Sequence, residues 1–509
     1  MIEVEVHQQL RALLRAQGGN AWPHHLTVAR LVARALRLQR STLMQIGSTA
    51  AYQGQHRLSY LASLLLWPEP LILVASAEVQ HSLCHVELPR LRDWLGLTKP
   101  VCLAQTWPDP NFSGIALFSP QDWLQHRLPQ HAPLPPGVPV AIDGAESLED
   151  WTRAHLTQTL LPQDWDALLW AYPTRVETIR DARAALTHTL FRHPPNPYGC
   201  LIVAEEDRRL LGHLVDRLQQ DSGQSFSGKW QQFTDTLLQP NTLVWAVLDR
   251  SQGSFSLNSA PIEVASALQP LWEGRTQILL NGVVDLDAQS EQFQLQLGLA
   301  DLTCVQFATD RHNEALSLYL PDGVPMPNTP EFAPALMRQL QCLLTLGFAA
   351  DTFSALIIDD LPLKSRIAST LAAEFGSRVK VEKGDCQVGD VLISGWTFWL
   401  EHRRSLPYPN LMAIATLPFP SLENPKVAGR VAYYKQQRQD WFRLYLLPEA
   451  LRILQEAIAP LRSQSSLLAL FDSRVLHRTY GQQVLTALGP YARLNYLDES
   501  ILIPPQCSV

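Results

Sequence analysis

Apolar residues recur along this chain at helical spacing in some segments and in short unbroken runs in others. Residues 24–40 carry apolar side chains three and four positions apart, whereas Arg30, Arg34 and Arg37 fall on another face. This periodicity predicts an amphipathic helix with one basic side. The unbroken apolar run at 71–76 predicts a buried strand instead.

The rest of the first half continues this alternation. A run at 138–142 predicts another buried strand, which leads directly into Asp143. Helical spacing dominates from residue 151 to about residue 239, and strand-like runs return at 242–248 and 276–284. Because strands that alternate with helices form parallel sheets, the first half predicts an α/β domain with a helical insertion.

A second alternation of helices and strands occupies the last third of the chain, after a proline-dense stretch typical of a linker. Its predicted helices are 335–348, 363–375 and 448–459, and its predicted strands are 355–358, 391–393, 411–415 and 467–471. The predicted division is a first α/β domain at 1–150, a helical insertion at 151–240, a return to the first domain at 241–320, a linker at 321–334 and a second α/β domain at 335–509.

Length and composition agree with two large globular domains. The chain has 509 residues, and a single hydrophobic core stops growing at roughly 250 to 300 residues. Apolar residues make up 46% of the chain and charged residues 17%, as in ordinary soluble proteins. The seven cysteines form no C-x-x-C pair, which argues against a disulfide framework, a zinc ribbon or an iron–sulfur site. No metal site is predicted.

The sequence also predicts a cytoplasmic protein without a membrane partner. The longest apolar stretch, 58–77, is interrupted at 68–70, so neither half reaches the roughly 20 residues that a bilayer span needs. The N-terminus carries Glu3 and Glu5 and lacks the basic and then apolar pattern of a signal peptide.

Charge is distributed unevenly along the chain. The formal net charge of −7 would by itself discourage binding to nucleic-acid phosphates. Residues 6–68, however, contain no Asp or Glu and seven arginines, at positions 11, 15, 30, 34, 37, 40 and 57. This locally basic segment is a candidate nucleic-acid surface.

Several segments, in order, resemble the motifs of DinG/XPD-type helicases of superfamily 2. In the first half these are ARLVARAL at 29–36, RLSYLASLLLW at 57–67, LILVASAEVQ at 71–80, VAIDGAESLEDW at 140–151 and ILLNGVVDLD at 278–287. In the second half they are the segment 395–425, which contains LPFP, then QEAIAPLRS at 455–463 and LLALFDSRVLHRTYG at 467–481.

The resemblance implies two RecA-like domains with parallel sheets, a helical insertion in the first, and ATP bound between them. An active member of the family would move along single-stranded DNA and unwind duplexes with energy from ATP. Some members hold an iron–sulfur cluster on four cysteines between their first two motor motifs. Here only Cys84 and Cys102 lie in that interval, so no cluster is predicted.

The segment in the place of the phosphate loop is GSTAAYQGQHR, residues 47–57. A phosphate loop needs glycines that expose backbone N–H groups, a lysine for the phosphates and a hydroxyl for magnesium. Gly47 and Gly54 are present, but the segment contains no lysine. His56 or Arg57 could supply positive charge, although neither precedes a suitable hydroxyl. These four residues are the remaining nucleotide-binding candidates.

The Walker B pair is also incomplete. This pair needs one carboxylate for magnesium and a second to orient the attacking water. Asp143 matches the first position, whereas Gly144 stands at the second. Glu146 takes the histidine position of the family's box, two residues further on, and cannot occupy the same point in space.

The remaining catalytic motifs keep only part of the family pattern. Asn281 and Gly282 replace the motif whose hydroxyl groups couple the domains. Gln455 and Arg462 match the last motif, but Ala459 falls where the arginine finger belongs. Loss of an arginine finger alone costs on the order of 10³ to 10⁵ in rate, so ATP hydrolysis is expected to be negligible.

Three functions follow from this pattern. The leading hypothesis is a DinG-like protein that lacks ATPase activity and binds single-stranded nucleic acid, with DNA favoured, or partners in repair and replication. The second is an active helicase with a rewired phosphate loop, which would bind ATP and magnesium. The third is a scaffold that binds proteins. The nucleic-acid-binding candidates are Arg30, Arg34, Arg37, Arg403 and Arg404.

Overall fold

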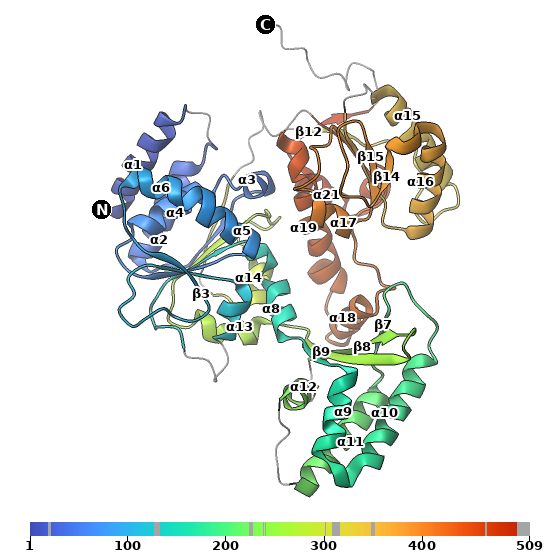
Figure 1. Cartoon of the computed structure of the whole chain (residues 1–509). Coiled ribbons are helices and arrows are strands. Elements are labelled where there is room, and N and C mark those ends of the chain that lie inside the picture. The colour runs from blue at the N-terminus through green and yellow to red at the C-terminus, as the bar shows by residue number, and fades with distance from the viewer. Residues whose placement is uncertain are drawn as a thin grey trace.

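The computed structural model describes residues 1–495, apart from 19–21, 127–132, 223–227, 238, 240, 301, 308–315, 348–351 and 464–465. The described residues form three units, which lie around a common junction (Figure 1). They are a first α/β domain (2–156 and 262–306), an inserted domain (157–261) and a second α/β domain (316–495).

The first α/β domain is built on a parallel sheet that has seven strands within the described residues. In spatial order they are β11 (Thr303–Gln306), β1 (Thr42–Gln45), β10 (Gln277–Asn281), β5 (Val140–Asp143), β2 (Leu71–Val74), β4 (Ile115–Phe118) and β3 (Val101–Ala104). Because all of them run parallel, their carboxyl ends share one edge. That edge receives the candidate residues that follow β1, β5 and β10.

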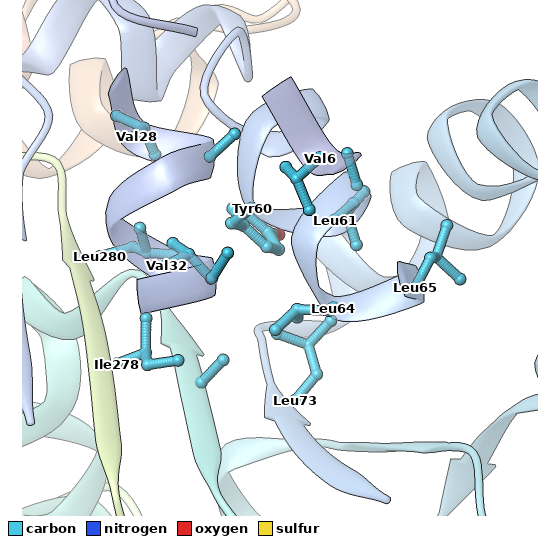
Figure 2. Packing of buried hydrophobic residues seen from close by; sticks show 14 of the residues in the cluster. Val6, Val28, Val32, Tyr60, Leu61, Leu64, Leu65, Leu73, Ile278 and Leu280 are labelled. Carbon is cyan, nitrogen blue, oxygen red and sulfur yellow. The ribbon is translucent and has the colours of Figure 1, made fainter. Parts of the chain in front are cut away.

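Helices cover both faces of this sheet. One face carries α1 (Ile2–Ala16), α2 (His25–Leu38), α4 (Arg57–Leu66) and α6 (Leu88–Leu95), and the other carries α7 (Pro120–Gln125), α8 (Leu148–Leu156), α13 (Ala265–Trp272) and α14 (Glu291–Leu297). Figure 2 shows how side chains such as Val6, Val32 and Leu64 pack together between the first set of helices and the sheet. Buried strands such as β2 and β10 supply the other side of this core.

The inserted domain combines helices with an antiparallel sheet. Its sheet order is β6 (Gln158–Leu160), β9 (Ser254–Pro261), β8 (Thr242–Asp249) and β7 (Cys200–Ile202). Four described helices pack on one face of that sheet, namely α9 (Pro162–Ala171), α10 (Val176–Phe191), α11 (Glu205–Ser222) and α12 (Lys229–Leu237).

The structure corrects the boundary that the sequence predicts at residue 241. The run at 242–248 is β8, which pairs with β9 as a hairpin and stays in the inserted domain. The physical reason is the tight turn between Asp249 and Ser254, which joins two neighbouring antiparallel strands. The predicted insertion also begins too early, because α8 packs in the core of the first domain.

The second α/β domain has another parallel sheet, again with seven strands in the described part of the chain. Its order is β14 (Val379–Val381), β15 (Val391–Ser394), β13 (Ser354–Ile357), β16 (Leu411–Ile414), β17 (Leu467–Leu470), β12 (Leu316–Tyr319) and β18 (Tyr491–Leu494). The helices are α15 (Phe332–Gly347) and α16 (Leu361–Phe375) on one face, α17 (Trp396–His402), α19 (Leu447–Ile458) and α21 (Gly481–Leu488) on the other, and α18 (Pro425–Gln436) and α20 (Arg474–His477).

The linker prediction is also corrected. Residues 316–319 form β12, which pairs with both β17 and β18, so the chain has entered the second domain before residue 321. The predicted linker 321–334 therefore connects β12 with α15 inside that domain. The connection between the two α/β domains includes residues 308–315, which lie outside the described residues.

The predicted fold class is confirmed, since two parallel α/β sheets are present and an inserted unit interrupts the first domain. The inserted sheet meets the second domain at α18, where Gly429 faces Leu243 of β8 and Ile202 of β7. A Cβ atom at Gly429 would lie 2.4 Å from a Leu243 methyl carbon, so any other residue there would displace the Leu243 side chain. The inserted domain is therefore in contact with the second domain as well as continuous with the first.

Candidate functional site

Residues 47–57, the predicted counterpart of a phosphate loop, follow β1 at the carboxyl edge of the first sheet. Gly47 has a positive φ of 92° and begins a short helix, α3 (Ser48–Gln53). Gly54 then turns the chain at φ 69°, and α4 begins at Arg57. A short helix, and not an open loop, therefore follows β1.

Asp143, the last residue of β5, lies directly against this segment and is 6% exposed. The Tyr60 hydroxyl donates a hydrogen bond of 2.8 Å to its Oδ2 atom. Nε2 of His56 lies 3.1 Å from Oδ1, and Nε of Arg57 lies 3.5 Å from Oδ2. Both carboxylate oxygens that could bind magnesium are thus occupied by side chains of the protein.

The Arg57 side chain also fills the space beside the second glycine. Its Nη1 atom lies 3.3 Å from Oε1 of Glu87, in an ion pair that is mostly buried. A Cβ atom at Gly54 would lie 2.9 Å from Nη1 of Arg57, so the guanidinium group folds back over the turn. The Arg57 guanidinium group, which could have contacted a phosphate, is instead paired with the carboxylates of Glu87 and Asp143.

These contacts change the titration of the cluster. Burial alone would raise the pKa of Asp143, but His56, Arg57 and the Tyr60 hydroxyl stabilise the carboxylate and lower its pKa to about 2. Burial and then the Asp143 charge raise the pKa of Tyr60 well above its usual value. Asp143 is therefore ionised and Tyr60 is protonated over the physiological pH range.

Glu146 lies near this cluster and faces the second domain. Its Oε2 atom accepts a 2.9 Å hydrogen bond from the backbone N–H of Gly282. Burial, followed by repulsion from Glu456, raises the pKa of Glu146 to about 7. A Cβ atom at Gly282 would lie 2.8 Å from Cβ of Ala51 and 3.0 Å from Oε1 of Glu146, so α3, β10 and Glu146 are tightly packed.

The helix α3 also forms part of the contact between the two α/β domains. It packs against the turn η6 (Ala459–Ser463) of the second domain. The Tyr52 hydroxyl donates a 3.0 Å hydrogen bond to the backbone carbonyl of Arg403. The Arg404 guanidinium lies 5.2 Å from the centre of the Tyr52 ring and pairs with Glu78 at 3.2 Å. The two candidate arginines of the second domain therefore contribute to the domain interface.

Gln455 and Arg462 have separate structural partners. The Gln455 side-chain amide accepts a hydrogen bond from the N–H of Val284 and donates one to its carbonyl, both at 2.9 Å. This exchange joins the domains directly. Arg462 is buried and donates to the backbone carbonyls of Leu488, Gly489 and Pro490 at the end of α21. The geometry gives Arg462 a role in holding that chain segment.

The arginines of α2 lie apart from this site. Arg30, Arg34 and Arg37 are exposed on α2, which lies on the outer side of the first domain, away from the second domain (Figure 1). Arg37 forms a 2.6 Å ion pair with Glu3 of α1. The structure therefore does not bring the α2 arginines together with Arg403 and Arg404.

Sequence reasoning missed Tyr60 and Tyr52, because both stand at positions that read as ordinary helical residues. Lys99 is the one lysine before residue 200. The Lys99 ammonium donates to the carbonyls of Leu64 and Glu69 near the end of α4. Burial lowers the pKa of Lys99 to about 8.

A cavity of about 670 Å³ lies where the three units meet. Its lining includes Glu146 and Asn281 of the first domain, Tyr198 of the inserted domain, and Phe419 and Gln455 of the second. Within the described residues, no group of three His, Cys, Asp or Glu side chains could hold a metal ion. Among the described helices, none has the length and apolar character needed to cross a membrane.

Comparison with known proteins agrees with this architecture. Residues 408–491 match the helicase C-terminal domain family, over a segment from just before β16 to the start of β18. Xpd4 of S. tokodaii superimposes with a TM-score of 0.59 at 11% identity, covering 93% of this chain and 100% of that chain. The chain has the XPD-type helicase fold.

Two further XPD structures support the same assignment. An apo XPD structure gives a TM-score of 0.56 at 14% identity and covers 92% of this chain, and an XPD helicase structure gives 0.57 at 12% identity and covers 93%. This chain covers 100% of both. None of the curated proteins matches the chain by sequence. Within the XPD-type helicase fold, the matched segment contains Gln455 and Arg462 and confirms the resemblance seen in LPFP and the following strand.

Proposed function

We propose that this protein uses an XPD-type helicase fold to bind nucleic acid without hydrolysing ATP, as a factor associated with DNA repair or replication. The observation that carries the proposal is the state of Asp143. Its two carboxylate oxygens contact His56, Arg57 and Tyr60, so magnesium would have to displace a buried set of protein partners.

Burial makes the displacement of the Asp143 partners costly in free energy. Removing one partner from a buried, hydrogen-bonded ion pair costs about 3–5 kcal/mol, because the other charge stays buried without compensation. A nucleotide would have to offset that cost before it gained any binding energy. It would also lack the lysine, the second carboxylate and the arginine finger on which phosphoryl transfer depends.

The nucleic-acid part of the proposal is supported by the family of the second domain and by the basic segment 6–68. Single-stranded DNA is the partner to test first. A purely protein-binding scaffold would give no reason for the exposed arginines of this segment, such as Arg30 and Arg34, which form no ion pair with a carboxylate of the described residues.

The test measures two properties of one purified sample of the whole chain. Phosphate release from Mg-ATP is followed with and without single-stranded DNA, and binding of fluorescent single-stranded DNA is followed by anisotropy at several salt concentrations. We expect no turnover above background and binding that weakens as salt rises.

Two results would overturn the proposal. DNA-stimulated turnover that disappears in Asp143→Asn, with the variant shown by circular dichroism to be folded, would establish an active helicase. Absence of any nucleic-acid binding would leave the protein-binding scaffold.

A further inference from the structure

The cavity at the junction of the three units has an excess of negative charge. Its lining includes seven carboxylates and three arginines. Each arginine already has an acidic partner, since Arg430 pairs with Glu149 at 2.9 Å and Arg452 with Glu449 at 2.6 Å. Arg443 pairs with a carboxylate outside the lining, Asp440, at 3.7 Å.

Four of the lining carboxylates have no such compensation. Among the described residues, no lysine or arginine forms an ion pair with Glu146, Asp285, Asp287 or Asp359. Backbone N–H groups hold all four in place, including the N–H of Trp396 near Asp359 and that of Glu291 at Asp287. Glu146, with a pKa of about 7, is only partly ionised near neutral pH, whereas Asp285, Asp287 and Asp359 place negative charge on the cavity wall.

A phosphate backbone in this cavity would meet like charge. A phosphate and a carboxylate about 4 Å apart repel each other by about 4 kcal/mol at the effective dielectric constant of a protein surface. The paired arginines offer no compensation without breaking their own ion pairs. The charge balance of the junction therefore opposes the binding of a phosphate backbone there.

The opposite charge balance occurs on the outer side of the first domain, on the pair of helices α1 and α2. The two helices pack against each other, and Glu3 near the start of α1 pairs with Arg37 near the end of α2, so they run antiparallel. This orientation places Arg11 and Arg15, in the second half of α1, alongside the first half of α2, which carries Arg30.

Four arginines of this helix pair, and Arg40 just beyond the end of α2, remain exposed and uncompensated. In the described chain, no carboxylate forms an ion pair with any of them, namely Arg11, Arg15, Arg30, Arg34 and Arg40. The one other acidic residue of α1, Glu5, is exposed. The surface is therefore basic within a protein of net charge −7.

This basic surface rests on a rigid support. Val6, Leu10 and Leu13 of α1 and Val28 and Val32 of α2 are buried against α4 and the sheet. Figure 2 shows Val6, Val28 and Val32 within this core. The exposed arginines can thus be substituted without opening the hydrophobic core.

From these two charge balances we infer that nucleic acid binds to the outer face of the α1–α2 helix pair through its phosphate backbone, and that the junction cavity does not take part. The inference rests on the proposed function, because it locates the nucleic-acid site of that function. Neither described helix carries a Phe, Trp or Tyr side chain, so base stacking contributes nothing there. Binding should then be independent of sequence and open to both single strands and duplexes.

The experiment uses the whole chain and fluorescent DNA of about 30 nucleotides, single-stranded or duplex, at several salt concentrations. The test variant carries Arg11→Gln, Arg30→Gln and Arg34→Gln. Its matched control removes three exposed arginines of the inserted domain through Arg180→Gln, Arg192→Gln and Arg217→Gln. Circular dichroism melting curves confirm that both variants are folded.

We expect the test variant to bind both forms of DNA at least about tenfold more weakly than the wild type. The slope of log affinity against log salt concentration should fall by the equivalent of about two to three phosphate contacts. The control variant should bind like the wild type. Wild-type binding that survives unchanged in the test variant would overturn this inference and leave the proposed function intact. No binding by the wild-type chain would overturn both.

A second variant tests the junction directly. Asp285→Asn, Asp287→Asn and Asp359→Asn keep an acceptor oxygen at each position and remove three negative charges. Its matched control neutralises three exposed acids of the inserted domain, through Glu177→Gln, Asp181→Asn and Asp216→Asn. We expect equal DNA affinity for the two variants. Clearly tighter binding by the junction variant alone would place the nucleic acid in the cavity and overturn the inference.

Discussion

At the scale of single residues, Asp143 is a buried carboxylate held by side chains of its own domain. It ends β5, and His56, Tyr60 and Arg57 surround it. A charge that is paired this completely contributes to folding. The same residue is thus expected to affect stability and to have no effect on turnover.

The first prediction concerns this carboxylate. Asp143→Asn should lower the free energy of unfolding by about 3–5 kcal/mol, because it leaves the Arg57 charge partly uncompensated in a buried site. Chemical denaturation followed by circular dichroism measures this loss. Asp109→Asn, at an exposed position of the same domain, is the control and should change stability little. Equal stability of the two variants would show that the Asp143 cluster is not structural.

The second prediction concerns Glu146 and pH. Its folded pKa of about 7 lies above the ordinary value, so the folded state holds the proton more tightly than the unfolded state. Its contribution to stability is therefore largest near pH 4 and falls as the pH rises toward 7. Glu146→Gln keeps an acceptor for the Gly282 N–H and should raise the melting temperature at pH 8 relative to the wild type. A wild-type melting temperature that exceeds the variant's at pH 8 would contradict this sign.

Sequence reasoning identified Asp143, His56 and Arg57 but not the relation between them. The motif pattern places these residues near the phosphate loop, because strand ends of parallel sheets meet at one edge. It cannot reveal that His56 and Arg57 point at Asp143, since that depends on the turn at Gly54 and on the packing of α4. Tyr60 has no motif signal of its own.

At the scale of elements, α3 follows β1 directly and packs against η6 of the second domain. The third prediction is that Tyr52→Ala speeds hydrogen exchange of backbone amides in α3 and η6, because it removes the bond to the Arg403 carbonyl and the ring beneath Arg404. Mass spectrometry after deuterium labelling measures this change.

Trp170→Ala serves as the control, since Trp170 is 86% exposed on the inserted domain and contacts neither element. Exchange in α3 and η6 that stays the same in Tyr52→Ala would show that the helix does not hold the domains together.

Long periodic helices and central strands were predictable from the sequence, whereas short strands and boundaries were not. The predicted helix at 24–40 corresponds to α2, and the predicted strand at 71–76 corresponds to β2. The strand β14 has only three residues and none of them is fully buried, and the polar Ser317 interrupts the apolar run of β12. Both strands depend on neighbours far away in sequence. Proline density at 321–334 suggested a linker, but pairing of β12 with β17 and β18 overrides that local signal.

At the scale of the whole molecule, direct protein contacts hold the two α/β domains together. They include the Gln455 hydrogen bonds to Val284 and the ion pair of Arg452 with Asp150 at 3.5 Å.

The fourth prediction is that Mg-ATP does not stabilise the protein. A ligand at 100 times its dissociation constant would add about 2.7 kcal/mol to the free energy of unfolding. A thermal melt with Mg-ATP in excess should therefore match one without it, and a clear upward shift would show that nucleotide binds the folded chain.

The contact between Gly429 and Leu243 also has a topological consequence. It completes a loop of three units, since the inserted domain is covalently joined to the first and the first contacts the second. A nucleic-acid strand threaded through this loop could leave only by sliding off at a free end, or after one of the contacts between the units had opened. A nucleic-acid strand that binds to the outer helices α1 and α2 does not pass through the loop. Circular and linear single-stranded DNA should then dissociate at equal rates, and persistent retention of the circle alone would show that the protein encircles its partner.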